Sequence, residues 1–145
     1  MDRGVALVVT LLVGALLAFQ PPVNAQLAKH VGDLGAAFTA LVVSAAMVGV
    51  LLVVAGDVGE LRGLRDYRPV YLVGALGGAA VVIVGLVAVR HLGAGGVAAA
   101  LVATQLIVAA LIDRLGLLGV HETPLDLGRI TGIVLLIAGT VLVVR

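Results

Sequence analysis

The stretch AAFTALVVSAAMVGVLLVVA, residues 36–55, contains no charged side chain. A helix needs about 20 mostly apolar residues to cross the hydrocarbon core of a bilayer, so this stretch predicts a transmembrane helix. Membrane-spanning β-strands alternate polar and apolar residues, whereas the run VGVLLVV at 48–54 does not alternate. The stretch therefore favours an all-α membrane protein.

The composition of the whole chain supports the same class. Of 145 residues, 62% are hydrophobic and 12% are charged, and the mean hydropathy is +1.27. Soluble domains are about 45–50% apolar and about 25% charged, so the composition excludes a soluble enzyme and a disordered chain. The net charge of +1 excludes a basic surface for nucleic acid. Cysteine is absent, which excludes disulfides and thiol chemistry.

Five segments are long and apolar enough to be spans, and the connections between them are short. Together they predict a five-transmembrane-helix bundle that forms a single integral membrane domain over residues 1–145. The predicted spans are about 5–27, 36–55, 70–89, 95–112 and 127–144.

The first span has a second interpretation. Residues 1–3 before an apolar run resemble the start of a secretory signal peptide, with residues 23–25 as a cleavage site and a mature start at Gln26. Pro21 and Pro22 disfavour cleavage without excluding it. We expect the span to be retained, and the intact mass of the membrane form distinguishes the two interpretations.

Lys and Arg near the span ends predict the orientation, because cytoplasmic loops carry an excess of them. With five spans, six of these residues share one side and three share the other. This predicts a cytoplasmic N-terminus and an external C-terminus in the inner or plasma membrane. The bias is modest, so a population with both orientations stays open. The six are Arg3, Arg62, Arg65, Arg68, Arg114 and Arg129, and the three are Lys29, Arg90 and Arg145.

Few polar side chains lie within the predicted spans, and these are the candidate substrate-binding residues. Gln20 and Asn24 are four residues apart and share one face of a helix. Gln105 and its neighbour Thr104 lie near the centre of the fourth span, and Ser44 lies near the centre of the second. The alternative is that these groups bond one another or the backbone, which is favoured for Ser44 and Thr104 because hydroxyls bond to their own helix.

Prolines and glycines supply the candidate hinge and packing positions. Pro21 and Pro22 predict a kinked or broken helix whose free N–H groups would face a bound anion or carbonyl. Closely spaced glycines let helices approach one another, and we expect them to pack within one protomer; a dimer seam or a sliding surface is the alternative. The candidate residues are Pro21, Pro22, Gly74, Gly77, Gly78, Gly132 and Gly139.

Residues at the span ends are interpreted as structural. Asp113 marks the interfacial end of the fourth span or bonds a nearby helix N-terminus. Residues 93–96, GAGG, predict a tight turn. Thr123 is the predicted N-cap of the last helix, with Pro124 at its first position. The histidines are too scattered for a metal site, and we expect no metal.

The order of short motifs resembles the YdcZ-like branch of the drug/metabolite transporter superfamily. That family has a Gln followed by Asn-Ala-x-Leu in its first helix, which residues 20–27, QPPVNAQL, match. This sequence departs from the family at Thr104, where a small glycine is usual, at Ala45, where a Phe is usual, and in retaining only Tyr71 of the aromatics before the third span. The matching positions in the second half are Arg90, His91, Leu92, Gly93, Gln105, Leu106, Asp113, Gly116, Gly119, Pro124, Arg129, Gly132 and Gly139.

The resemblance implies that the five-helix unit is half of a ten-helix inverted-repeat carrier. It implies an antiparallel homodimer, or a heterodimer with a homologue, and an odd number of spans would let a flipped copy complete the site. It also implies that Gln20, Asn24 and Gln105 line that site. Small multidrug relatives exchange protons through a carboxylate in the first helix, but residues 4–30 contain no Asp or Glu, so that mechanism does not transfer.

These observations predict a secondary transporter for a small polar or amphipathic solute, working by alternating access. The alternative is a non-transporting membrane subunit that packs against a larger partner through its glycine-rich helix faces. The sequence offers no filter for a channel and no nucleophile with a base for an enzyme, and we expect no cofactor. The predicted partners are the lipid bilayer, the solute and a second copy or homologue.

Overall fold

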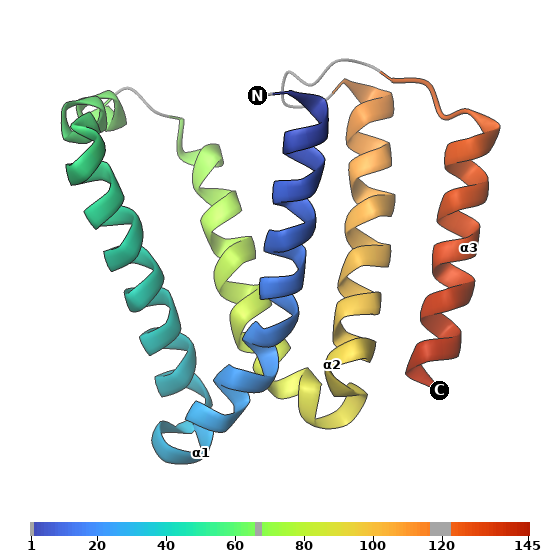
Figure 1. The fold of residues 1–145 in the computed structure, drawn as a ribbon, viewed down its shortest axis with the longest axis horizontal. Coiled ribbons are helices and arrows are strands. Elements are labelled where there is room, and N and C mark those ends of the chain that lie inside the picture. Colours follow the sequence, from blue (N-terminus) through green and yellow to red (C-terminus); the bar gives the residue numbers. More distant parts are fainter. Residues whose placement is uncertain (1, 66–67, 117–122) are drawn as a thin grey trace. The chain divides into compact units, whose positions relative to one another are not determined.

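The computed structural model describes residues 2–65, 68–116 and 123–145, and every regular element in these ranges is a helix. The all-α class is therefore confirmed for the described residues; Gly119 of the family pattern lies outside them. The elements in chain order are the α-helix α1 (Arg3–Ala55), the 3-10 helices η1 (Asp57–Arg65) and η2 (Pro69–Leu72), and the α-helices α2 (Val73–Leu115) and α3 (Leu127–Val144) (Figure 1).

Three helical stretches are long and apolar enough to cross a membrane: Arg3–Ala55, Val70–Leu115 and Leu127–Val144. Their large apolar side chains face outward, with Leu34 72% exposed, Val54 79% exposed and Leu127 82% exposed. An apolar outer surface of this extent is costly in water and suits the hydrocarbon core of a bilayer. The structure thus supports a membrane protein.

The two longest helices are each interrupted once by a glycine. At about 1.5 Å per residue, the 53 residues of α1 would extend about 80 Å, well beyond a hydrocarbon core of roughly 30 Å. The interruption in α1 lies at Gly32, with φ 75° and ψ 166°, and that in α2 at Gly93, with φ 68° and ψ 168°. This backbone region is essentially restricted to glycine. Gly93 confirms the turn expected at residues 93–96, whereas the five-span count stays a prediction.

The helix does not break at Pro21 and Pro22, and the other outcome predicted there, a kink, stays a prediction. α1 keeps helical dihedral angles through both prolines, and its non-helical residue is Gly32. A proline inside a helix removes one backbone hydrogen bond, but in lipid a helix remains the best way to satisfy the other backbone groups. Gly32 breaks the helix because it alone adopts a dihedral pair closed to other residues.

Residues 1–90 form one of two compact units. In this unit the two arms of α1 and the first part of α2 meet in a small apolar core, which contains Ala28, Ala36, Ala37, Val82 and Leu86. Alanines at these positions let the helices approach closely, which is how helices associate without a hydrophobic drive in lipid.

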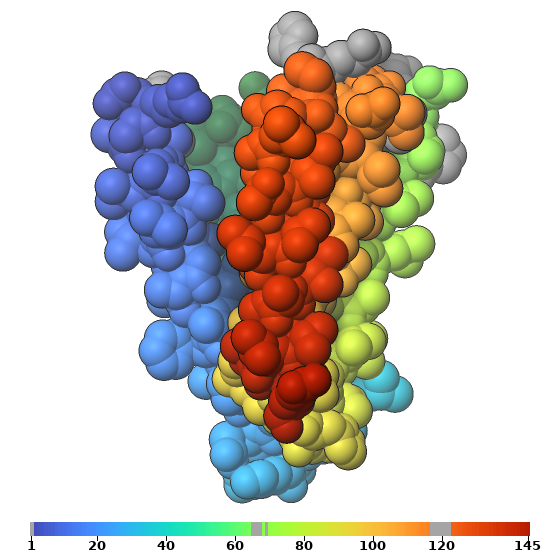
Figure 2. Space-filling model, turned by 90° about the vertical axis from the view of Figure 1, so that its right-hand side faces the viewer, coloured from blue at the N-terminus to red at the C-terminus, as the bar shows by residue number. Residues whose placement is uncertain are grey.

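Residues 91–145 form the second unit, in which the later part of α2 and α3 lie side by side (Figures 1 and 2). The Thr140 hydroxyl lies 2.8 Å from the Leu136 carbonyl oxygen of its own helix and 3.2 Å from the Ala99 carbonyl oxygen of the other, so its one proton is shared between them. A Cβ on Gly96 would stand 3.6 Å from a methyl group of Val144, so the helices approach closely here. Small residues and this interhelical contact therefore help to hold the unit together.

The predicted N-cap of the last helix is wrong. α3 begins at Leu127, and its N-cap is Asp126, whose Oδ1 accepts a hydrogen bond from the Arg129 amide at 2.7 Å. Asp is as good an N-cap as Thr, and its negative charge is favourable at the positive end of the helix. Pro124 precedes the helix.

We expect Gly32→Ala and Gly93→Ala each to reduce the free energy of unfolding by about 1–3 kcal/mol, because alanine is strained in that backbone region. No atom lies within 4 Å of the Cβ that either substitution adds, so the loss would come from the backbone alone. Denaturation of the purified protein in mixed micelles measures it.

The matched control is Gly49→Ala, since Gly49 is helical and also has open space at its Cβ position. Alanine is a better helix former than glycine, so we expect this variant to gain about 0.5–1 kcal/mol. Equal effects of Gly32→Ala and Gly49→Ala would contradict the assigned turn.

Candidate functional site

Asn24 is the one buried polar side chain among the described residues, with 7% of its surface exposed. Its Nδ2 atom lies inside the protein and has no hydrogen-bond partner in the structure. A buried donor without a partner costs about 1–3 kcal/mol, so such groups are rare unless they have a role. This amide is the strongest sign of a site in the first unit.

The packing of α1 against α2 places this amide. Gly85 lies against Pro21, where an added Cβ would stand 3.6 Å from the proline Cγ, and Gly85 is itself buried. Asn24 follows Pro21 by about one turn of α1, and Ala25 and Ala28 beside it are buried too. The close approach of the two helices therefore removes Asn24 from solvent.

Gln20 and Asn24 share a face of α1, because the helix continues through both residues. Gln20 is half-buried, and no hydrogen bond joins it to another described residue. The structure thus brings together two carboxamides with free donors and acceptors. A carboxamide supplies two donors and one acceptor oxygen, which suits a polar but uncharged part of a solute.

Gln105 lies on the later part of α2, in the second unit, and is exposed. No hydrogen bond to another described residue occupies its carboxamide. Its predicted role at the site stays a prediction.

The hydroxyls of Ser44 and Thr104 are occupied on their own helices. Ser44 Oγ donates to the Ala40 carbonyl oxygen at 2.8 Å, and Thr104 Oγ1 donates to that of Ala100 at 3.0 Å. This is the local bonding expected of hydroxyls within helices. Their role at a solute site stays a prediction. Each hydroxyl oxygen could still accept a hydrogen bond from a solute while its own proton bonds the helix.

The predicted hinge glycines face open space. Gly74, Gly77, Gly78, Gly132 and Gly139 each have no atom within 4 Å of an added Cβ. Glycine faces of this kind leave room for the backbone of another helix.

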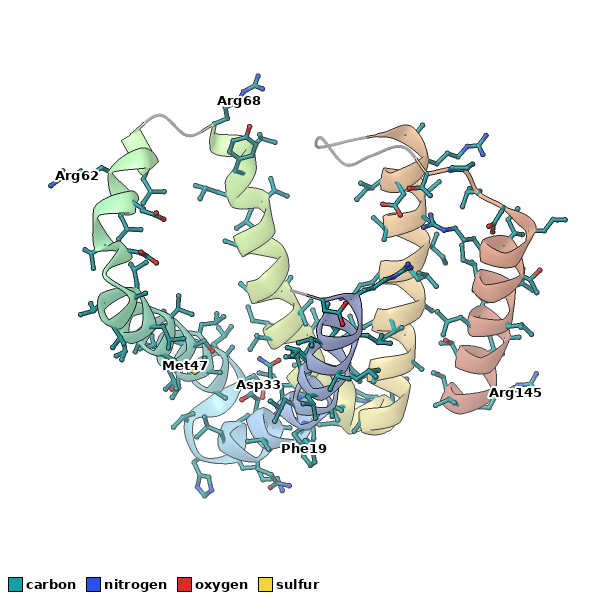
Figure 3. The ribbon with its side chains drawn as sticks, turned by 45° about the horizontal axis from the view of Figure 1, so that its top comes forward. Phe19, Asp33, Met47, Arg62, Arg68 and Arg145 are labelled. Atoms are coloured by element: carbon teal, nitrogen blue, oxygen red, sulfur yellow. The ribbon has the colours of Figure 1, made fainter. Side chains whose placement is uncertain are left out.

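Two ion pairs were not predicted from the sequence. In the first unit, Arg90 donates through both terminal nitrogens to the two carboxylate oxygens of Asp33, next to the turn at Gly32. Figure 3 shows Asp33 at the end of the unit opposite Arg62 and Arg68. Both partners are partly exposed, so the pair is worth about 0–1 kcal/mol. A signal was present, since both residues lie at predicted span ends with opposite charge.

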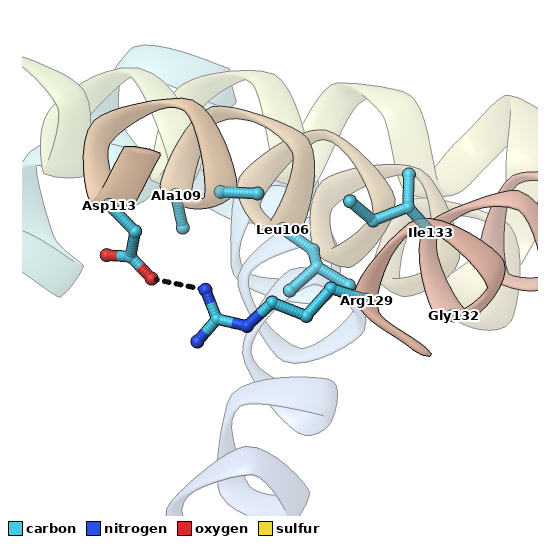
Figure 4. A pocket seen from close by; sticks show the side chains of 7 residues that line it. Leu106, Ala109, Asp113, Arg129, Gly132 and Ile133 are labelled. Atoms are coloured by element: carbon cyan, nitrogen blue, oxygen red, sulfur yellow. Dashed lines mark hydrogen bonds and ion pairs between the residues drawn. The ribbon is translucent and has the colours of Figure 1, made fainter. Parts of the chain in front are cut away.

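The second ion pair joins α2 to α3. Arg129 Nη1 donates to Asp113 Oδ2 at 3.3 Å, and the Asp113 carbonyl oxygen accepts from the Thr123 amide at 3.0 Å. The expected interfacial role of Asp113 therefore includes a contact with the first turn of the last helix. The pair borders a cavity of about 210 Å³ with apolar walls (Figure 4).

A family model described as “Putative inner membrane exporter, YdcZ” matches residues 5–142, nearly the whole chain. No match was found among the curated proteins or among the solved structures.

We expect Asn24→Leu to leave the free energy of unfolding unchanged or to raise it by about 1–2 kcal/mol. Leucine has a similar shape and removes the buried donor that lacks a partner. Denaturation in mixed micelles measures the change, with Thr10→Val as the control, because the Thr10 hydroxyl bonds the Ala6 carbonyl oxygen on the exposed surface of the same helix. A loss above about 1 kcal/mol in Asn24→Leu alone would show that the amide is needed for folding.

Proposed function

Because the chain belongs to the YdcZ family, we propose that it is a secondary transporter that moves a small solute across the inner membrane by alternating access. The family description and the apolar helices support a multi-pass transporter of the inner membrane. The family description names an exporter and no enzyme activity. The observation that carries the finer proposal is the buried Asn24 amide without a partner.

The solute would bind to uncharged side-chain amides within the membrane-spanning helices. Gln20, Asn24 and Gln105 would donate and accept hydrogen bonds, with Ser44 and Thr104 as further acceptors. Loss of one bonded partner at such a site weakens binding by about 1–3 kcal/mol. Filling the vacant donor of Asn24 with a solute acceptor would recover part of the cost of burying it.

Five spans are part of the proposal. The turns at Gly32 and Gly93 divide the two long helices into segments of a length that crosses a bilayer once. With α3 this makes five crossings, which would place the termini on opposite sides. The charge distribution favours a cytoplasmic N-terminus.

An antiparallel dimer would complete the carrier. Five spans would supply half of an inverted repeat, and a flipped copy or homologue would supply the other half. The open glycine faces at Gly74, Gly77, Gly78, Gly132 and Gly139 support a seam or a sliding surface there. Movement would use these faces together with Pro21 and Pro22, where α1 lacks backbone donors.

The same glycine faces support the second candidate, a non-transporting subunit bound to a larger membrane partner. Purification of the chain alone separates the two. A self-dimer with solute flux supports the carrier, and recovery only with an unrelated protein supports the subunit.

In proteoliposomes we expect Asn24→Ala and Gln105→Ala each to weaken solute uptake by about tenfold or more, through loss of a hydrogen-bonded partner. A panel of metabolites and amphipathic compounds, first screened by thermal shift, supplies the solute. Thr10→Ala is the matched control, since its hydroxyl bonds only the exposed Ala6 carbonyl oxygen in the structure. Uptake unchanged in both amide variants that insert normally would disprove the site.

Single cysteines test the spans directly, because the chain contains none of its own. We expect Gly59→Cys and Ala94→Cys to react with a membrane-impermeant thiol reagent from opposite sides. Gly59 lies in η1 and Ala94 follows the turn at Gly93. Ala46→Cys, inside the second predicted span, is the unreactive control. Labelling of Gly59→Cys and Ala94→Cys from the same side on every molecule would contradict the five-span arrangement.

A further inference from the structure

The cavity between the end of α2 and the start of α3 has a chemistry that the transport proposal does not use. The negatively charged carboxylate of Asp113 and the positively charged guanidinium of Arg129 lie together at one end of it (Figure 4). The rest of its wall is apolar and consists of Leu106, Ala109, Ala110, Gly132 and Ile133. We propose that this cavity binds a small zwitterion with an apolar body, such as an α-amino acid with a branched aliphatic side chain.

The charged end offers bonds to a ligand. Arg129 and Asp113 share one contact at 3.3 Å, which is longer than the usual 2.7–2.9 Å of a charge-assisted hydrogen bond. A guanidinium carries five N–H donors and a carboxylate accepts at about four positions, so one contact leaves most of this capacity unused. Both side chains are partly exposed, 41% for Arg129 and 31% for Asp113, so a ligand has access to them.

The charges select a zwitterion. A lone anion on Arg129 would compete with Asp113 and then face its negative charge, and a lone cation on Asp113 would face Arg129. A charge left unpaired in a partly apolar site is costly. A ligand with one ammonium and one carboxylate places opposite charge against each side chain at once, which is the complementary arrangement.

The backbone that carries the two charged side chains is held in place. Asp126 caps the first turn of α3 and accepts from the Arg129 amide at 2.7 Å. Asp113 lies in the last turns of α2, and its carbonyl oxygen is bonded by the Thr123 amide. A site whose backbone is already positioned loses less entropy when the ligand binds.

The size of the cavity limits the apolar body. Its volume is about 210 Å³, and a cavity of about 150 Å³ is enough for benzene. One branched aliphatic side chain fits this space. Leu106 lies about two turns before Asp113 in α2, and Ile133 lies about one turn after Arg129 in α3. The apolar body of the ligand would therefore extend from the ion pair toward these two side chains.

Equilibrium binding of radiolabelled leucine to the purified full chain in phosphatidylglycerol nanodiscs tests the proposal without any measurement of flux, so it is independent of the proposed function. Two competitors share the aliphatic body of leucine: 4-methylpentanoate lacks the ammonium, and 3-methylbutylamine lacks the carboxylate. We expect saturable leucine binding, with both competitors weaker by about tenfold or more, because each leaves one charge unpaired. Absence of saturable binding, or equal displacement by the three compounds, would overturn the proposal.

Two variants locate the binding. We expect Arg129→Gln to weaken leucine binding by about tenfold or more through loss of the cation. Ile133→Phe keeps both charges and fills the cavity, so it should weaken binding as well and remains informative where the loss of Arg129 lowers stability. Arg114→Gln and Ile130→Phe, neighbours that do not line the cavity, should stay within about twofold of the unaltered chain. Full binding in both Arg129→Gln and Ile133→Phe would overturn the assignment.

A lipid headgroup is the competing source of the same chemistry. In nanodiscs of phosphatidylethanolamine, whose head is also zwitterionic, we expect leucine binding to persist. Binding that occurs in phosphatidylglycerol and disappears in phosphatidylethanolamine would show that a lipid head occupies the cavity, and would overturn the proposal.

Discussion

The backbone conformation of Gly32 is the constraint on which the first unit depends. The positive φ at this residue ends one arm of α1 and begins the next, so that Ala28 before the turn and Ala36 and Ala37 after it enter one core. Val82 and Leu86 of α2 close that core, and Arg90 is bonded to Asp33 just after the turn. Without the reversal, α1 would be a continuous rod too long for a bilayer, and Asn24 would have no packed surroundings.

In the proposed site, the buried amide of Asn24 lowers the stability of the fold in exchange for a group that can bind a solute. A helix packed through alanines excludes water without supplying many hydrogen-bond partners, so a carboxamide placed there has no acceptor for its Nδ2. A protein selected only for stability would carry an apolar residue at this position. An amide buried at that cost supports the proposal of a ligand that bonds it, as functional sites often contain groups that destabilise the fold.

The sequence was sufficient to predict features that depend on local composition. It failed for features that depend on which residues lie close together in space. Residues 36–55 are apolar whatever surrounds them, so their helix was predicted correctly, and residues 93–96 are so rich in glycine that a turn was expected there. At Pro21 and Pro22 the sequence allowed either a kink or a break, and the continued helical dihedral angles of α1 exclude the break. The bond between Asp113 and Arg129 required knowing that α3 returns beside α2, and Asp126 displaced Thr123 as the cap because the helix begins later than expected.

The polar groups of this chain divide into two chemical classes with different places along the helices. A charged side chain costs at least about 2.5–3.5 kcal/mol at the centre of a bilayer, so Asp33, Arg90, Asp113 and Arg129 lie near turns or helix ends and are paired. Carboxamides cost less to bury, which is why Gln20 and Asn24 occupy the interior of an apolar helix. A solute with charged groups would therefore be recognised near a helix end, where ions are tolerated, whereas groups that pass deeper into the membrane would meet neutral donors and acceptors. The bilayer thus separates selection by charge from selection by hydrogen bonding, and the described residues include groups of both kinds.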